Sequence, residues 1–288
     1  MAAFLTHLVV GEQVWGRLDD RWPQAWATAR QGPAGERAQS DGRWSNREDY
    51  GTFLFGCLAP DVDKLCDGLE QGVTHFLPKD EAGTYAWKRS LRFLDAPTEY
   101  LRAPFGALHP GEQAFVLGYL CHVTTDEISG RLAPVVEDYL VGLGTSVPHV
   151  DAVLTAMDPG FWAVAEDRES VIAALSVAQI PDGTFPLGSS SCLAAMHQIV
   201  LPQVREGGGL LPYLSMVRRQ KRWMRHGQVS DATDDAVLEA ELASYRRQIE
   251  ADLPASEQLV DTMELELFVK EAVGHSCQRI CALLNGDC

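Results

Sequence analysis

The sequence lacks any run of about 18 apolar residues, the length that a helix needs to cross a bilayer. Its N-terminus has no basic leader ahead of an apolar core, which argues against a secretion signal. The seven cysteines are an odd number and form no Cys-x-x-Cys pair, so a disulfide framework is not expected. These absences predict a cytoplasmic protein without a transmembrane segment, in which the thiols are reduced.

Positive charge is also scarce, because 24 Lys and Arg residues face 40 Asp and Glu residues and give a formal net charge of -16. Such a surface repels a polyanion, so general nucleic-acid binding is disfavoured. One cationic helix face departs from this balance and could meet phosphate head groups or an anionic substrate. Its residues are Arg218, Arg219, Lys221, Arg222 and Arg225. The alternative is a solvated face paired with local Asp and Glu residues.

What the sequence does contain is helical periodicity over most of its 288 residues, of which 46% are hydrophobic. Helices are predicted over 4–18, 85–94, 115–128, 131–143, 168–179, 191–205, 210–226, 234–253 and 256–284. The polar segment 31–49 is predicted to be an exposed loop, long enough to be a lid. Alternating β-branched strands are missing, so we expect a single all-α domain over 1–288, a bundle of roughly eight to eleven helices.

The helix predicted over 115–128 carries His122 and Asp126 four residues apart, on one face. The surrounding run is apolar nearly all round, so the helix should be buried. A desolvated carboxylate needs a partner or a cation. Gly118, one turn earlier, leaves room for a neighbouring helix or an ion. From this helix alone, a metal-ligand pair and a structural His–Asp hydrogen bond both remain open.

Three further stretches offer candidate ligands. His7 lies on the inward face of the helix predicted over 4–18, and His75 is flanked by apolar residues. Pro60 is expected to end the helix formed by the apolar run 53–58 and to present Asp61 and Asp63 from its end. The alternatives are a packed core histidine for His7 and a turn with solvated carboxylates for Asp61 and Asp63. All of these candidates lie in the first 130 residues, ahead of a helical half over 131–288.

Taken together, three imidazoles and two carboxylates form a ligand set suited to zinc, with one carboxylate able to bridge two ions. Their motifs are a histidine in the first helix, Phe-Leu-Phe-Gly-Cys-Leu-Ala-Pro-Asp at 53–61, Thr-His-Phe at 74–76 and Gly-Tyr-Leu-Cys-His-Val-Thr-Thr-Asp at 118–126. In this order they resemble the zinc-dependent phospholipase C family, which is related to the S1/P1 nucleases. The resemblance covers about the first 130 residues.

The resemblance implies an all-helical fold in which metals among the helices hydrolyse phosphate esters. It implies one zinc held by Asp61, His75, His122 and Asp126. It further implies that Asp126 bridges to a second zinc, which His7 and the free amino group of the mature N-terminus also bind. Here Met1 precedes Ala2, a small residue that permits removal of the methionine, so the amine of Ala2 is the expected ligand.

The family's third zinc takes a histidine shortly after the helix motif and then a His-x-x-x-Glu or His-x-x-x-Asp pair. This sequence continues instead with Glu127, and neither His149 nor His197 is followed four residues later by an acid. We therefore expect one or two zinc ions and not three. A bound metal brings the pKa of its water to about 7, and Asp61 or Asp63 would act catalytically by orienting that water or taking its proton.

The sequence thus predicts a zinc-dependent phosphoric ester hydrolase that acts on a phosphodiester or phosphomonoester, such as a phospholipid head group. One alternative is an S1/P1-like nuclease, against which the charge of -16 weighs. The other is a catalytically degenerate, metal-stabilised helical binding protein, suggested by the missing third-zinc ligands.

Overall fold

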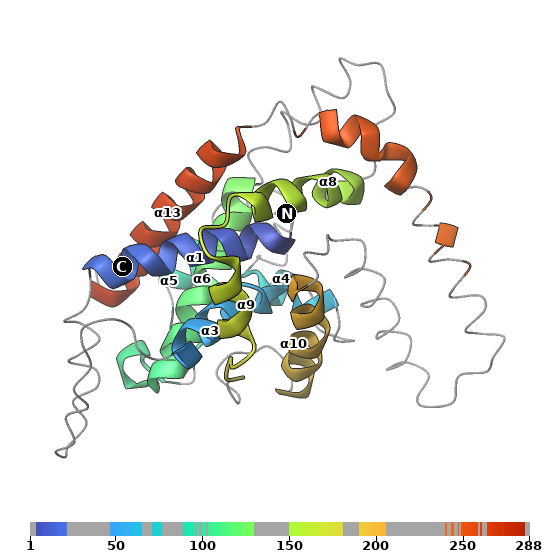
Figure 1. The fold of residues 1–288 in the computed structure, drawn as a ribbon. Coiled ribbons are helices and arrows are strands. Elements are labelled where there is room, and N and C mark those ends of the chain that lie inside the picture. The colour runs from blue at the N-terminus through green and yellow to red at the C-terminus, as the bar shows by residue number, and fades with distance from the viewer. Residues whose placement is uncertain are drawn as a thin grey trace, which may run out of the picture.

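The computed structural model describes residues 4–21, 47–64, 71–76, 89–95, 97, 100–101, 103–129, 150–180, 190–205, 240, 243–244, 247, 249–258, 260 and 264–285. Within these ranges the chain forms helices and no strand, which confirms the prediction of an all-α fold (Figure 1). That residues 1–288 form one domain stays a prediction. Among the described helices, none is both long and apolar enough to span a bilayer.

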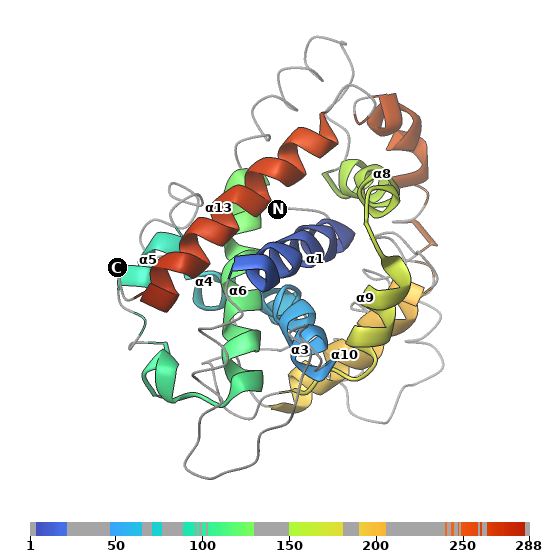
Figure 2. The same ribbon diagram turned by 60° about the vertical axis from the view of Figure 1, so that its left-hand side comes forward.

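The central element is α6 (Pro110–Ser129), which begins earlier than the predicted 115. Proline is tolerated at a first helical position because its missing N–H would have no partner there. The Glu112 carboxylate reaches back to accept a hydrogen bond from the His109 N–H at 3.0 Å, which helps to set the start of the helix. From Glu112 onward every residue of α6 is buried, as an all-round apolar helix requires. Three helices pack around it (Figure 2): α1 (Phe4–Arg21), α3 (Arg47–Gly56) and α13 (Leu265–Asn285).

Two helices from the start of the chain cover α6. The first, α1 (Phe4–Arg21), confirms the helix predicted over 4–18. The second, α3 (Arg47–Gly56), begins inside the predicted loop, so the loop expectation is wrong for residues 47–49. Two acidic residues in its first turn stabilise a helix start there through the helix dipole. The proposed lid over 31–46 lies outside the described residues.

Helix α3 ends at Gly56 rather than at Pro60, and the chain continues as a 3₁₀ helix, η1 (Ala59–Lys64). Pro60 lies in the first turn of η1, where its missing N–H costs no hydrogen bond. The expectation that Asp61 and Asp63 follow directly from the end of the α-helix is therefore corrected, since both lie within η1. Asp61 is buried, whereas Asp63 is partly exposed.

Glycine lets α3 and α6 approach each other closely. A Cβ atom on Gly118 would overlap the backbone carbonyl of Phe53, and one on Gly56 would overlap the carbonyl of Phe115. The room predicted at Gly118 is therefore taken by a neighbouring helix. The close crossing brings the end of α3 against the ligand-bearing part of α6.

We predict that Gly118→Ala destabilises the protein by about 3 kcal/mol, because the new methyl group must push two backbones apart. Gly274→Ala is the matched control, since Gly274 lies inside α13 (Leu265–Asn285) with nothing within 4 Å of its added Cβ atom. The control should gain about 0.5–1 kcal/mol from helix propensity. Urea denaturation measures both changes, and equal midpoints for the two variants would contradict a tight crossing.

The remaining elements are α4 (Gln71–Thr74), α5 (Arg89–Asp95), η4 (Phe105–Ala107), α8 (Val150–Ala163), α9 (Arg168–Leu175) and α10 (Ser190–Arg205). Helix α10 confirms the helix predicted over 191–205, whereas α9 ends before the predicted 179. Helix α8 was missed because the Asp-Pro-Gly sequence at 158–160 is typical of a turn. The helices predicted over 131–143 and 210–226, with the cationic face, lie outside the described residues.

Two other expectations are corrected. Residues 249–258 are helical through Pro254, and the last helix begins at Leu265 rather than at 256. A proline removes one backbone hydrogen bond from a helix but does not always end it. Cys192 is disulfide-bonded, so the expectation of reduced thiols is wrong at this position. The free cysteines of the described residues are Cys57, Cys121, Cys277 and Cys281.

Candidate metal centre

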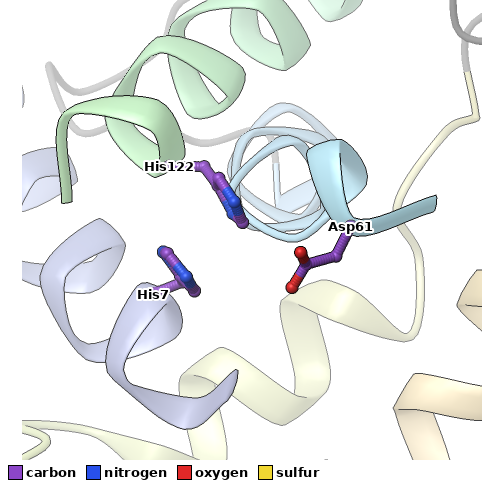
Figure 3. Close-up of side chains that lie close together, drawn as sticks. All are labelled: His7, Asp61 and His122. Atoms are coloured by element: carbon purple, nitrogen blue, oxygen red, sulfur yellow. The ribbon is translucent and has the colours of Figure 1, made fainter. Parts of the chain in front are cut away.

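The five predicted ligand residues come together in the interior of the protein, from α1, η1, the end of α4 and α6. Their exposed fractions are 1% for His7, 8% for Asp61, 0% for His75, 1% for His122 and 3% for Asp126. Figure 3 shows the His7 and His122 rings lying face to face, with the carboxylate of Asp61 beside them. Residues 119 positions apart in the sequence thus share one buried site, which only the tertiary fold can bring about.

Ligand atoms of three residues lie around the Nε2 atom of His75. The Nε2 atom of His75 lies 3.3 Å from His122 Nε2 and 3.6 Å from Asp126 Oδ2. Asp61 Oδ1 is 3.7 Å from the same His75 nitrogen, and His122 Nε2 is 3.9 Å from Asp126 Oδ2. Zinc bonds of about 2.0–2.2 Å place neighbouring tetrahedral ligands about 3.3–3.6 Å apart. The atoms of His75, His122 and Asp126 are therefore spaced slightly wider than in a zinc shell, and Asp61 is joined to them through His75.

The orientation of His122 is set by the backbone of the α3–η1 connection. Its Nδ1 atom donates a hydrogen bond to the carbonyl oxygen of Cys57 at 2.7 Å. A carbonyl only accepts hydrogen bonds, so Nδ1 carries the proton. In the neutral ring, Nε2 then presents its lone pair toward His75 and Asp126. Outer hydrogen bonds of this kind fix the tautomer of metal-binding histidines.

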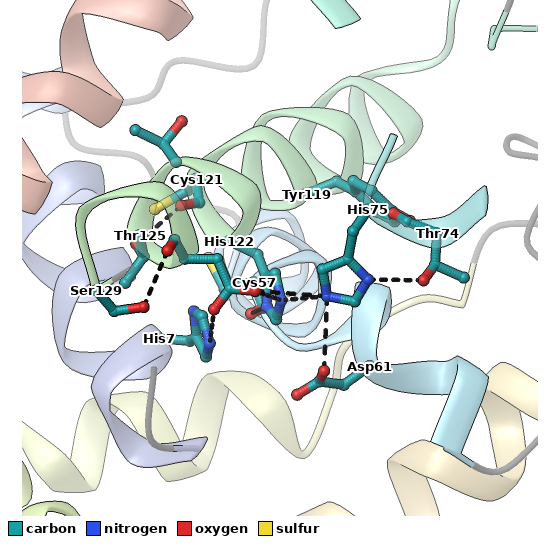
Figure 4. Close-up of polar contacts among 12 residues, drawn as sticks. His7, Cys57, Asp61, Thr74, His75, Tyr119, Cys121, His122, Thr125 and Ser129 are labelled. Carbon is teal, nitrogen blue, oxygen red and sulfur yellow. Dashed lines mark hydrogen bonds and ion pairs between the residues drawn. The ribbon is translucent and has the colours of Figure 1, made fainter. Parts of the chain in front are cut away.

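His75 is oriented by the residue before it (Figure 4). The hydroxyl oxygen of Thr74 lies 2.8 Å from His75 Nδ1, and the carbonyl of Thr74 accepts a hydrogen bond from the Tyr119 hydroxyl. Tyr119 lies on α6 one turn before His122, so α6 supports the second histidine as well as supplying the first. Both imidazoles therefore meet the site through Nε2, with Nδ1 engaged away from it.

The residue after His75 has an uncommon backbone conformation. Phe76 has a φ of 56°, in the left-handed region that bulky residues rarely adopt. Its ring packs on Phe93, Tyr100 and Tyr119, with centroid distances of 5.2, 4.5 and 5.6 Å. Aromatic packing thus holds a strained turn next to a ligand, a position where strain is often stored at functional sites.

His7 reaches the cluster from α1. Its ring stacks on His122 with centroids 3.8 Å apart and an interplanar angle of 9°, and its Nε2 atom lies 3.7 Å from Asp126 Oδ1. The two oxygens of Asp126 therefore face different histidines, since Oδ2 points to His75 and His122. This is the arrangement that a carboxylate needs in order to bridge two ions.

Asp126 is the charge at the centre of the cluster. Burial raises the pKa of its carboxyl, but the positive charges of the amino terminus and of His122, His7 and His75 in their protonated forms outweigh this effect and hold the pKa well below its ordinary value. The carboxylate is therefore ionised at neutral pH, the state in which it binds a cation. Met1 and Ala2, to which the expected N-terminal ligand belongs, lie outside the described residues.

Two acidic residues near the site, Asp63 and Glu127, are not among its grouped ligands. Asp63 belongs to neither of the two sets of ligand atoms that lie within 4.8 Å of one another. Burial above all, and then the negative charges of Asp63 and Asp61, raise the pKa of Tyr119. Glu127, directly after Asp126, accepts hydrogen bonds from the backbone N–H of Ser90 and from its hydroxyl, the latter at 2.8 Å. It thereby satisfies the start of α5, a role that sequence reasoning missed.

The arrangement can hold a metal ion. The ligand atoms form two groups, and within each group all atoms lie within 4.8 Å of one another. One group consists of His7, Asp61 and His122, and the other of His75, His122 and Asp126. His122 belongs to both groups, so one ion or two adjacent ions would share this centre. No family model, curated protein or solved structure matches the chain.

Proposed function

We propose that this protein is a zinc-dependent phosphoric ester hydrolase. The observation that carries the proposal is the convergence of buried ligand atoms from Asp61, His122 and Asp126 on the Nε2 atom of His75. Nitrogen and carboxylate ligands in this ratio suit zinc, and the orienting hydrogen bond from His122 to a backbone carbonyl supports the same choice. The resemblance to zinc-dependent phospholipase C supports phosphate esters as the substrate class.

The chemistry would divide between the metal and the carboxylates. When bound, zinc supplies a Lewis acid and brings the pKa of water to about 7. Asp61 is the most exposed of the five ligand residues, which favours it as the carboxylate that meets water. Its carboxylate would orient the attacking water and take its proton. With a net charge of -16, a small phosphodiester or a phospholipid head group suits the protein better than a polynucleotide.

A second candidate is a metal-stabilised helical binding protein without catalysis. Glu127 favours it, because the residue after the ligand motif accepts hydrogen bonds from Ser90 and so joins α6 to α5. The ligands come from four segments that are distant in the sequence, so a metal here would add to stability whether or not it acts on a substrate.

Metal content and turnover together test the proposal. Elemental analysis gives the zinc stoichiometry, and bis(p-nitrophenyl) phosphate, p-nitrophenyl phosphate, phosphatidylcholine vesicles and single-stranded DNA serve as substrates. We expect bound zinc and turnover of at least one small phosphoester or phospholipid, lost on chelation and restored by zinc. Bound zinc with no turnover favours the binding protein, and cleavage of DNA alone favours the nuclease.

We also predict that the N-terminus decides between one and two ions. A C-terminally tagged protein that begins at Ala2 should hold two zinc ions, because its free amine can join His7 and Asp126 as ligands. An N-terminal extension should leave about one ion. Loss of a residue that hydrogen-bonds to a metal ligand weakens metal affinity about 10–100-fold, and loss of a ligand itself should weaken it at least as much. Equal stoichiometry in the two proteins would exclude the amine as a ligand.

A further inference from the structure

Helix α8 contributes a buried carboxylate that lies outside both ligand groups. Asp158 has an exposed fraction of 0% and is followed by Pro159 inside the helix. Its Oδ1 atom accepts a hydrogen bond from the backbone N–H of Leu5 at 2.8 Å. The two residues are 153 positions apart, so the bond ties distant parts of the chain. A buried carboxyl group is costly unless it is hydrogen-bonded, so its position calls for a role.

The partner of Asp158 lies in the first turn of α1. Backbone N–H groups there have no partner within the helix, and the positive end of the helix dipole favours an anion. His7 belongs to this same turn. Helices α1 and α8 pack against each other, and both views show α8 near the start of α1 (Figures 1 and 2).

We propose that Asp158 is a positioning residue for the metal centre. Its carboxylate holds the first turn of α1, and this turn sets the distance from His7 to Asp126 and the stacking of His7 on His122. The inference rests on the proposed function, since it gives Asp158 a role only if His7 helps to hold a metal. It adds α8, a helix that carries none of the five ligand residues, to the elements that build the site.

In a different interpretation, Asp158 binds the metal directly. Two substitutions at Asp158 separate this interpretation from the positioning role. Asp158→Asn keeps an oxygen that can accept the hydrogen bond of Leu5 but loses the charge. Asp158→Ala loses both. Asp167→Ala is the matched control, because Asp167 caps α9 by accepting the Ser170 N–H at 2.9 Å, and α9 carries none of the five ligand residues.

Zinc affinity and the visible absorption of the Co²⁺-substituted protein are the readouts. We expect Asp158→Ala to weaken binding of the ion held by His7 about tenfold, as loss of an outer partner does, and to change the Co²⁺ spectrum. Asp158→Asn and Asp167→Ala should both stay within about twofold of the wild type. An Asn variant as defective as the Ala variant would overturn the proposal, because the charge itself would then be needed.

A double-mutant cycle tests whether the effect passes through His7. In a His7→Ala background, Asp158→Ala should cause no further loss of affinity, because the side chain that it positions is gone. An equal tenfold loss in both backgrounds would overturn the proposal. If Asp158→Ala does not fold, Asp158→Thr replaces it, since its hydroxyl is one bond shorter and falls short of the Leu5 N–H.

The proposed function and the positioning role fail in different ways. If the wild type binds no zinc, or if His122→Ala leaves zinc binding unchanged, both are overturned. If His122→Ala removes zinc while Asp158→Ala alters neither the affinity nor the Co²⁺ spectrum, the positioning role alone is overturned.

Discussion

Zinc content is expected to fall from one or two ions per chain to near zero in His122→Ala and in Asp126→Ala. His122 belongs to both ligand groups, and Asp126 is the carboxylate that faces all three histidines. Removing either residue opens a buried shell whose remaining charges are left uncompensated. Elemental analysis after dialysis against metal-free buffer measures the loss. Both variants should also melt at lower temperature, because bound metal stabilises only the folded state.

His197→Ala is the matched control for these variants. His197 is a partly buried histidine on α10 whose Nε2 atom donates to the carbonyl of Leu175 at 2.7 Å, and it belongs to neither ligand group. It should cost stability through the lost hydrogen bond and leave the zinc content unchanged. If the zinc content of His122→Ala and Asp126→Ala equals that of this control, the His122–Asp126 pair reverts to a structural contact and the metal proposal fails.

The candidate site could be predicted from the sequence where side chains carry the chemistry. His122 and Asp126 share a helix face, and helix periodicity alone makes that visible. The role of Cys57 could not be found, because it orients His122 through a backbone carbonyl that every residue type has. Asp158 was not identified from the sequence for another reason. The Asp-Pro-Gly sequence that it begins is typical of a turn, and its hydrogen-bond partner is a backbone N–H.

The fold was predictable where periodicity is strong and less so where tertiary contacts override local signals. Helix α1 and helix α10 follow their apolar spacing closely. Helix α3 starts in a segment of loop-like composition, where Gly51 packs directly on the backbone of α9. A Cβ atom there would overlap the carbonyl of Ala174, so this contact needs glycine, a residue that weakens the local helix signal.

Asp61→Asn is expected to lower the phosphodiesterase rate by about 10²–10⁴-fold, the range for loss of a general base, while Asp63→Asn changes it only a few-fold. Both carboxylates lie on η1, so the same Asp→Asn substitution at the two positions gives a matched pair of variants. Asp61 Oδ1 lies 3.7 Å from His75 Nε2 and belongs to a ligand group, whereas Asp63 belongs to neither group. The sequence alone left either residue as the catalytic carboxylate.

Zinc content separates the two ways in which Asp61 could act. If Asp61 takes the proton of the attacking water and its ligand contribution is small, Asp61→Asn keeps its zinc and loses kcat, with the acidic limb of the pH–rate profile removed. If it is mainly a ligand, zinc and rate fall together and added zinc partly restores the rate. Equal rates for the two variants would contradict both roles and move the catalytic carboxylate away from Asp61. A larger loss in Asp63→Asn, with zinc retained, would instead place the base at Asp63, on the partly exposed side of η1.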